Sequence, residues 1–298
     1  MKTLPIIEQH FHGAYGVDFN SATAEDIVTL SEKLVKIGIG GFLPTLVTDS
    51  IENTKRQINR IKEASKNCKN ILGIHLEGIF LNPEKCGIHN VAHFQALTID
   101  NYKIIEDEFI KIVTLAPELD EGLIAYLKKQ NIKVQAGHCV GWANGINKPD
   151  GATHMFNAMS GISHKHDSTT LSALLDDDVF TEIIGDGIHV IDDALKLLLK
   201  TKPENKILLI SDALPITYSN MKETVFADSV IYYNGKDARS ASGTLAGSTH
   251  LLPDIIKRLC QKGLFKPQYI ENSYKYLGIE PKGELVWDEN YNVKEFIY

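Results

Sequence analysis

Short apolar runs rich in β-forming residues alternate with helical stretches along the chain as far as Ser211, and this alternation constrains the fold more than any other feature. The runs are Pro5–His12, Gly38–Val47, Ile71–Glu77, Ile110–Leu115, Ile132–His138, Ala152–Met155, Phe180–Ile184 and Lys206–Ser211. Most of them are continuously apolar, which is typical of parallel strands buried on both faces. Eight strand–helix units predict a (β/α)8 TIM-type barrel. An open doubly wound sheet is the alternative, but no GxGxxG pattern follows the first run.

The segments between the runs carry apolar residues at helical spacing. We expect helices at Ala24–Ile37, Ile51–Ser65, Asp120–Gln130, Ser168–Asp176 and Asp192–Leu199. Because these helices separate consecutive strands, they belong on the outside of the predicted barrel.

After Leu214 the alternation ends. Val225–Tyr233 predicts strands of a β insertion near residues 223–245, and Thr249–Gln261 predicts a further helix. The tail Gly283–Tyr298 alternates like a pair of strands around a turn. We therefore divide the chain into a barrel of residues 1–265, which includes the insertion, and a small, reduced β appendage of residues 266–298.

Composition excludes several classes of protein. With 298 residues, of which 43% are hydrophobic and 23% charged, the chain can bury a sizeable core. Its 31 basic and 38 acidic residues give a net charge of -7, which argues against a nucleic-acid binder or a binder of anionic membranes. No apolar stretch reaches the roughly 20 residues that span a bilayer. The scattered cysteines predict free thiols, and hence a cytoplasmic protein.

Histidines and carboxylates gather at the ends of the predicted strands, where barrel enzymes build their active sites. The residues that share this position are His10, His12, Glu77, His138, His154 and Asp212. A lone histidine at a strand end is more often structural, but these six converge on one point. Burying a carboxylate among apolar strands is costly unless it is paired or bound to a metal. Imidazole and carboxylate ligands suit Zn²⁺ or a similar divalent ion, so the pattern predicts a metal site.

The strand-end residues belong to longer phrases that follow one another along the chain. These phrases are His10–His12, Gly41–Leu46, His75–Pro83, Gly87–Asn90, Thr114–Glu118, Thr153–Met159, Gly185–Val190 and Gly243–Ser248. In this order they resemble the N-acetylglucosamine-6-phosphate deacetylases of the amidohydrolase superfamily. The resemblance covers most of the chain. It implies a barrel of the metal-dependent hydrolase kind, which hydrolyses the acetamide of N-acetylglucosamine 6-phosphate, or of a close N-acetylamino sugar, to the amino sugar and acetate. It also implies a homodimer.

The resemblance assigns roles residue by residue. It implies that the metal ligands are Glu77, His138 and His154, and that His10 and His12 hold a second ion where two are bound. One or two ions per chain are therefore expected, with Zn²⁺ first and Fe, Mn or Co as alternatives. Asp212 is implied as the general base, which takes a proton from the attacking water and returns it to the departing amine. The implied contacts to the sugar or its phosphate are His89, Asn157, the backbone of Ala158, His189 and Lys165.

The chain departs from the family pattern in three places. Lys165 stands where the family has an arginine that reaches the phosphate; it keeps the charge without the planar two-pronged geometry. Ile79 replaces a proline, and we expect the family's N-terminal segment, half of a small β-sandwich, to be missing. Two other functions stay open: a different amidohydrolase reaction, such as cyclic-amide hydrolysis or deamination, and a non-catalytic sugar-binding barrel. Against cyclic-amide hydrolysis, the fourth strand ends without a lysine. Against a non-catalytic barrel, the metal ligands and the base are all present.

Overall fold

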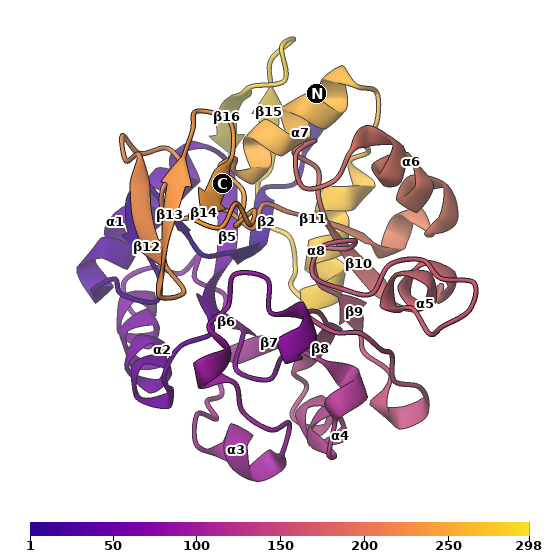
Figure 1. Ribbon diagram of the computed structural model, residues 1–298. Coiled ribbons are helices and arrows are strands. Elements are labelled where there is room, and N and C mark those ends of the chain that lie inside the picture. The colour runs from indigo at the N-terminus through magenta and orange to yellow at the C-terminus, as the bar shows by residue number, and fades with distance from the viewer. Residues whose placement is uncertain (298) are drawn as a thin grey trace.

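Eight parallel strands form the wall of a barrel in the computed structural model, which describes residues 1–297 (Figure 1). In chain order they are β2 (Ile6–Phe11), β5 (Ile39–Val47), β6 (Ile74–Glu77), β7 (Ile110–Leu115), β8 (Lys133–Ala136), β9 (Gly151–Ala152), β10 (Phe180–Ile184) and β11 (Ile207–Ile210). Neighbours in the sequence are neighbours in the sheet. Seven strands fall within the predicted apolar runs, whereas β9 begins one residue before its run and shares only Ala152 with it. The predicted (β/α)8 barrel is confirmed.

Two backbone hydrogen bonds join the last strand to the first just beyond β11. Asp212 N donates to the carbonyl of His10 at 2.9 Å, and His12 N donates to the carbonyl of Ala213 at 2.8 Å. These bonds bring the segments carrying His10, His12 and Asp212 together at the carboxyl end of the barrel.

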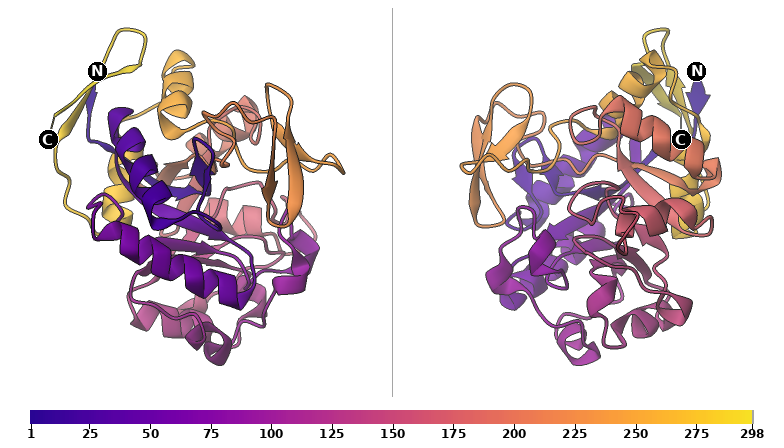
Figure 2. Two further views of the ribbon diagram at one scale, coloured as in Figure 1. Left: turned by 90° about the vertical axis from the view of Figure 1, so that its left-hand side faces the viewer. Right: turned by 45° about the vertical axis from the view of Figure 1, so that its right-hand side comes forward.

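Helices cover the outside of the barrel (Figures 1 and 2). They are α1 (Ala24–Lys36), α2 (Ile51–Ser65), α3 (Ile99–Lys103), α4 (Leu123–Lys129), α5 (Thr169–Leu175), α6 (Asp192–Thr201), α7 (Leu252–Gln261) and α8 (Gln268–Leu277). Short 3-10 helices lie at Pro83–Lys85, Val91–His93, Pro117–Leu119, Gly145–Asn147 and Glu204–Lys206. In residues 1–297 we find no helix with the length and apolar character needed to cross a membrane.

The first helix shows how local sequence sets these elements. Thr23 caps α1: its hydroxyl accepts from Asp26 N, and the Asp26 side chain accepts from Thr23 N. Ile27, Leu30 and Leu34 then recur at helical spacing and are buried. The cap starts the helix at Ala24, and the apolar stripe holds it against the barrel.

The C-terminal part of the chain differs from its prediction as a purely β appendage, because it begins with α8. This helix packs against the barrel: Tyr274 donates its hydroxyl to the carbonyl of Pro5 at 2.8 Å, and Asn272 Nδ2 donates to the carbonyl of Ile207 at 2.7 Å. After α8, β15 (Glu284–Trp287) and β16 (Val293–Ile297) pair antiparallel, and β15 also pairs with β1 (Lys2–Thr3). Tyr298, the end of the predicted strand pair, lies outside the described residues.

The β insertion forms a separate antiparallel sheet of β12 (Glu223–Phe226), β13 (Ser229–Tyr233) and β14 (Ala238–Ser240). Figure 2 shows this sheet and the β1-β15-β16 sheet on opposite sides of the molecule. A small pair, β3 (Gly13–Ala14) with β4 (Val17–Asp18), follows the first barrel strand. The insertion lies at the end of the barrel where the strands end, whereas the β1-β15-β16 sheet lies at the opposite end (Figure 2).

Candidate metal centre

The six strand-end residues predicted from the sequence lie together at the carboxyl edge of the barrel. His10 and His12 lie at the end of β2, and Glu77 is the last residue of β6. His138, His154 and Asp212 each follow a strand by two residues, after β8, β9 and β11. All six are buried.

Glu77 divides the cluster into two halves through its carboxylate oxygens. Oε2 lies 3.0 Å from His12 Nε2 and 3.2 Å from His10 Nε2. Oε1 lies 2.9 Å from His154 Nε2 and 3.4 Å from His138 Nε2. Two ligands that each lie about 2.0–2.2 Å from one cation are separated by about 3–3.5 Å. Each half, which we name the Oε2 half and the Oε1 half, therefore has the spacing of ligands around an ion.

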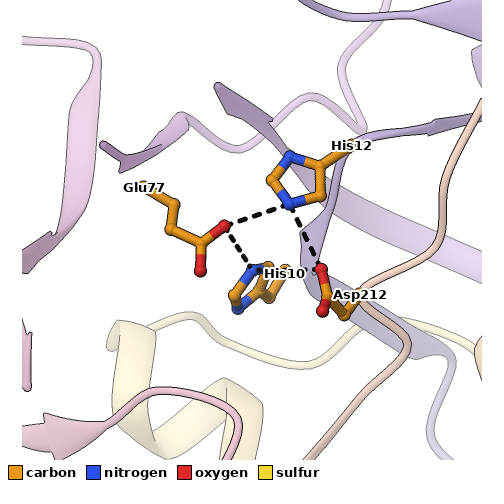
Figure 3. Close-up of side chains that lie close together, drawn as sticks. All are labelled: His10, His12, Glu77 and Asp212. Atoms are coloured by element: carbon orange, nitrogen blue, oxygen red, sulfur yellow. Dashed lines mark ion pairs between the residues drawn. The ribbon is translucent and has the colours of Figure 1, made fainter. Parts of the chain in front are cut away.

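Asp212 completes the Oε2 half. Its Oδ1 lies 3.2 Å from His12 Nε2 and 3.6 Å from His10 Nε2, and Figure 3 shows these side chains pointing toward one another. The backbone of Asp212 is held on both sides, because its N–H donates to the carbonyl of His10 and its carbonyl accepts from Ser248 N. The carboxylate is thereby aimed at the imidazoles.

The donor set fits a cation because of where the imidazole protons lie. The Nδ1 atoms of His10, His12 and His138 face acceptors: Glu182 Oε2 at 2.9 Å, the carbonyl of Thr45 at 3.2 Å and the carbonyl of Lys85 at 2.8 Å. A neutral imidazole that donates from Nδ1 carries a lone pair on Nε2. These lone pairs face carboxylates, and His138 Nε2 lies only 3.1 Å from His154 Nε2. Such an arrangement is repulsive unless protons or a metal cation lie among the donors, and the residues present fit one divalent ion or two.

The electrostatics of the cluster favour positive charge. Burial alone would lower the pKa of His10, but the carboxylates of Glu77 and Glu182 outweigh it and raise the pKa well above its ordinary value. Against the same burial, hydrogen bonds with Asp212 and Glu77 raise the pKa of His12 to about 9. Burial would raise the pKa of Glu77, but the charge of His10 and hydrogen bonds from the surrounding histidines hold it well below its usual range. The field that attracts these protons also attracts a metal cation.

Three of these residues have left-handed backbone conformations that are uncommon outside glycine. The φ angles are 49° at His138, 29° at His154 and 53° at Asp212. Such conformations cost energy and cluster at functional sites. Here they turn the chain as it leaves the barrel strand and direct the three side chains into the cluster.

His89 lies beside the metal cluster. Its Nε2 is 4.0 Å from Glu77 Oε2, its ring lies 4.3 Å from that of His138, and its Nδ1 forms a 2.8 Å hydrogen bond with Thr48 Oγ1. Burial, followed by the charge of His138, lowers the pKa of His89 well below its ordinary value. His89 is therefore a neutral polar group at the edge of the cluster.

The other predicted substrate contacts lie in different surroundings. Asn157 Nδ2 donates to the carbonyl of His154 at 3.2 Å, so it stabilises the turn after that histidine, and Ala158 follows with a φ of 47°. His189 has both ring nitrogens engaged, with Asp186 Oδ2 at 2.7 Å and the carbonyl of Ala246 at 2.7 Å. Lys165 is exposed in the loop before α5, outside the cluster.

Two residues of the site escaped the sequence analysis. Glu182, fully buried in β10, binds His10 from behind. The signal that could have identified Glu182 is that it is the one charged residue in the strand Phe180–Ile184. Phe226, at the end of β12, packs edge to face on the His12 ring with centroids 4.9 Å apart. No local pattern marks Phe226, because its partner is more than 200 residues away in the sequence.

No family model matches the chain. It is similar to the N-acetylglucosamine-6-phosphate deacetylase of Bacillus subtilis, with 33% identity over 263 residues, which cover 82% of this chain and 65% of the relative. The N-acetylgalactosamine-6-phosphate deacetylase of Escherichia coli O157:H7 is 30% identical over 86% of this chain and 71% of the relative. The N-acetylglucosamine-6-phosphate deacetylase of Haemophilus influenzae is 30% identical over 86% and 70%. The chain thus spans slightly less than two thirds of the Bacillus relative.

Solved structures share the architecture. The crystal structure of N-acetylglucosamine-6-phosphate deacetylase from Thermotoga maritima superposes with a TM-score of 0.91 at 26% identity, covering 99% of this chain and 86% of that one. The corresponding enzyme from Pasteurella multocida gives a TM-score of 0.89 at 26% identity, covering 99% and 84%. The chain therefore has the same fold as these two solved proteins over nearly its whole length.

Proposed function

Because this chain belongs to the N-acetylglucosamine-6-phosphate deacetylase family, we propose that it hydrolyses the acetamide of N-acetylglucosamine 6-phosphate to the amino sugar and acetate. The observation that carries the proposal is the convergence of four imidazole Nε2 atoms on Glu77, with Asp212 beside them. An amide is a poor electrophile with a poor leaving group, so its hydrolysis needs carbonyl polarisation and a base. The cluster offers groups for both tasks.

We assign the metal to the two halves of the Glu77 cluster. Glu77, His138 and His154 would hold one ion, and His10 and His12 would hold a second across Glu77. Imidazole with carboxylate is the donor set of catalytic zinc sites, so Zn²⁺ is the ion we propose. When bound, such an ion polarises the acetamide carbonyl and makes water more acidic.

Asp212 is the proposed general base. Burial raises its pKa, but the hydrogen bond with His12 and the charges of the neighbouring imidazoles lower it below the ordinary value, so Asp212 is ionised at neutral pH. An ionised carboxylate accepts the proton of the attacking water and can return it to the leaving nitrogen. The backbone bonds to His10 and Ser248 hold Asp212 for both transfers.

His89, Asn157, the backbone of Ala158, His189 and Lys165 are the proposed contacts to the sugar and its phosphate. His89 is supported by its place beside the cluster. His189 is supported by its positive charge: both ring nitrogens form hydrogen bonds, and Asp186 raises the pKa of this imidazole although burial lowers it. Lys165 adds a cation on the surface. With this set, phosphate recognition rests on few positive groups.

A cytoplasmic homodimer is the proposed state of the protein. The thiols of Cys68, Cys86, Cys139 and Cys260 are free, as is usual in a reducing compartment. Light scattering at micromolar concentration measures the assembly: twice the chain mass supports the dimer, and the single mass contradicts it.

Acetate release from metal-reconstituted protein tests the activity. N-acetylglucosamine 6-phosphate, N-acetylgalactosamine 6-phosphate and unphosphorylated N-acetylglucosamine are compared at equal concentration. The galactosamine ester is the second candidate because a relative with that name is 30% identical. The highest kcat/KM is expected for the glucosamine ester. Absence of acetate from all three, in protein shown to contain metal, would contradict the proposed function.

A further inference from the structure

Glu182 is a carboxylate in the middle of β10 that is fully buried inside the barrel. Its Oε2 accepts from His10 Nδ1 at 2.9 Å. Its Oε1 accepts from Gln9 Nε2 at 2.7 Å and from Gln135 Nε2 at 3.0 Å. A buried charge is costly unless it is paired and hydrogen-bonded, and here both oxygens have partners.

A chain of hydrogen bonds across the barrel interior fixes the position of Glu182. Gln135, which donates to it, accepts from Thr153 Oγ1 at 2.8 Å. Thr153 and Thr114 share a 2.7 Å hydrogen bond, and Thr114 Oγ1 bonds His75 Nε2 at 2.8 Å. Because Gln9 and His10 also bind Glu182, any rotation of this side chain breaks several buried hydrogen bonds. The carboxylate is therefore a rigid support behind His10.

His10 differs from the other imidazoles of the cluster in this support. His12 and His138 face neutral backbone carbonyls through Nδ1. His154 Nδ1 has no hydrogen-bond partner among residues 1–297. A carboxylate behind a metal-binding histidine fixes the tautomer, orients the ring and makes the coordinating nitrogen more basic. Glu182 thus strengthens the Oε2 half selectively.

Charge counting leads to the same half of the cluster. Glu77 and Asp212 already balance the charge of one divalent ion. Glu182 adds a third, fully buried carboxylate, so one divalent ion leaves one of the three negative charges uncompensated. A buried excess of negative charge is unfavourable, so the third carboxylate favours additional positive charge in the Oε2 half, which it contacts through His10.

We propose that Glu182 is a positioning residue that fixes the His10 imidazole and thereby strengthens metal binding in the Oε2 half. This proposal rests on the metal-dependent function above. Glu182 does not touch the reacting atoms; it acts through His10.

Glu182→Gln tests the proposal, because the amide keeps the size of the side chain and removes its charge. Metal-free protein is titrated with Co²⁺, followed by the visible absorption of bound cobalt and by elemental analysis. For the unaltered chain we expect two ions. For Glu182→Gln we expect one binding step to stay unchanged and the other to weaken by about 10–100-fold. Glu182→Asp, which restores the charge, should recover part of the lost affinity.

The control for general damage to the core is Glu8→Gln. Glu8 is a second fully buried glutamate, on β2, whose Oε1 accepts from Ser211 N at 3.1 Å rather than from an imidazole. We expect this variant to bind both Co²⁺ ions like the unaltered chain. If Glu8→Gln weakens the same step equally, or if Glu182→Gln weakens both steps alike, the effect is general damage to the core and the proposal is wrong.

The remaining outcomes separate this proposal from the one it rests on. Two ions bound with unchanged affinity in Glu182→Gln would overturn the role of Glu182 and leave the deacetylase function standing. A single ion in the unaltered chain would also overturn it. No bound ion in the unaltered chain, in protein whose circular dichroism shows it folded, would contradict the metal-dependent function itself.

Discussion

The metal cluster and the loop that carries Lys165 are organised in opposite ways. Around Glu77 the side chains are buried, and most imidazoles are fixed from behind by a backbone carbonyl or a carboxylate. In the loop before α5, Lys165 and His166 are exposed, and their backbone N–H groups donate to Ser163 Oγ. The groups proposed for bond cleavage belong to the barrel core, whereas the proposed phosphate cation lies on the surface.

The difference has a consequence for what each region determines. A buried, hydrogen-bonded cluster keeps its geometry before substrate arrives, which is what electrostatic catalysis requires. An exposed lysine loses side-chain entropy when it binds phosphate, and this loss reduces its net contribution. We therefore expect substitutions in the cluster to affect turnover strongly, and substitutions in the loop to affect the choice of substrate modestly.

Asp212→Asn gives the largest expected effect, on the buried side of the comparison. The amide keeps the shape of the side chain but cannot accept the proton of water, so kcat should fall by about 10²–10⁴-fold. Elemental analysis should still find the ion that Glu77, His138 and His154 hold, because Asp212 lies in the other half of the cluster. A variant that keeps its activity would remove Asp212 as the general base.

Glu8→Gln tests the cost of burying charge in the barrel. Burial raises the pKa of Glu8 from 4.5 to about 8, against hydrogen bonds from Ser211 that lower it. A group whose pKa is raised on folding stabilises the protein fully below pH 4.5, and that stability is lost as the pH rises to about 8. The loss is about 1.4 kcal/mol per pH unit inside this window.

The measurement is the free energy of unfolding by urea from pH 5 to pH 9. At pH 8 and above, Glu8→Gln should be more stable than the unaltered chain by roughly 5 kcal/mol, because the amide does not ionise. The advantage should shrink toward pH 5. Parallel curves for the two proteins across the whole range would show that Glu8 does not titrate on unfolding.

The buried metal cluster was predicted from the sequence better than the exposed loop that carries Lys165. Continuous apolar runs identify strands covered on both faces, and a barrel brings the ends of such strands together. The six predicted donors follow from these two facts and from the positions of a few polar residues. No comparable rule relates Lys165 to a partner, because exposed side chains leave no pattern in the apolar periodicity.

Other parts of the structure could not be predicted for specific physical reasons. The buried face of α8 consists largely of Tyr269, Tyr274 and Tyr276, with Asn272, so it lacks the aliphatic stripe of an ordinary amphipathic helix. Glu182 looked like an isolated charge, since its partner His10 lies 172 residues earlier. Contacts of this kind depend on which strands the closed barrel brings together and not on local sequence.

Lys165→Ala tests the exposed side directly. If the ammonium group binds the phosphate, its loss should raise the KM for N-acetylglucosamine 6-phosphate about tenfold, the usual effect of losing one charged hydrogen bond. The KM for unphosphorylated N-acetylglucosamine should not change, and Lys165→Arg should keep most of the preference. Equal losses on both substrates would exclude Lys165 as a phosphate contact.

The smallest expected effect comes from the contact between the β insertion and the loop that carries His89. At the turn after β12, Asp228 Oδ2 accepts from Asn90 Nδ2 at 2.8 Å and pairs with His93 Nε2 at 3.1 Å. Both partners in the ion pair are partly exposed, at 60% for Asp228 and 28% for His93. Exposed pairs contribute at most about 1 kcal/mol, so Asp228→Ala should change kcat/KM less than about fivefold.

Phe226, which precedes this turn, is buried against His12. Phe226→Ala should therefore impair turnover more than Asp228→Ala. The reverse order would show that the exposed contact, and not the buried ring, holds the insertion over the site.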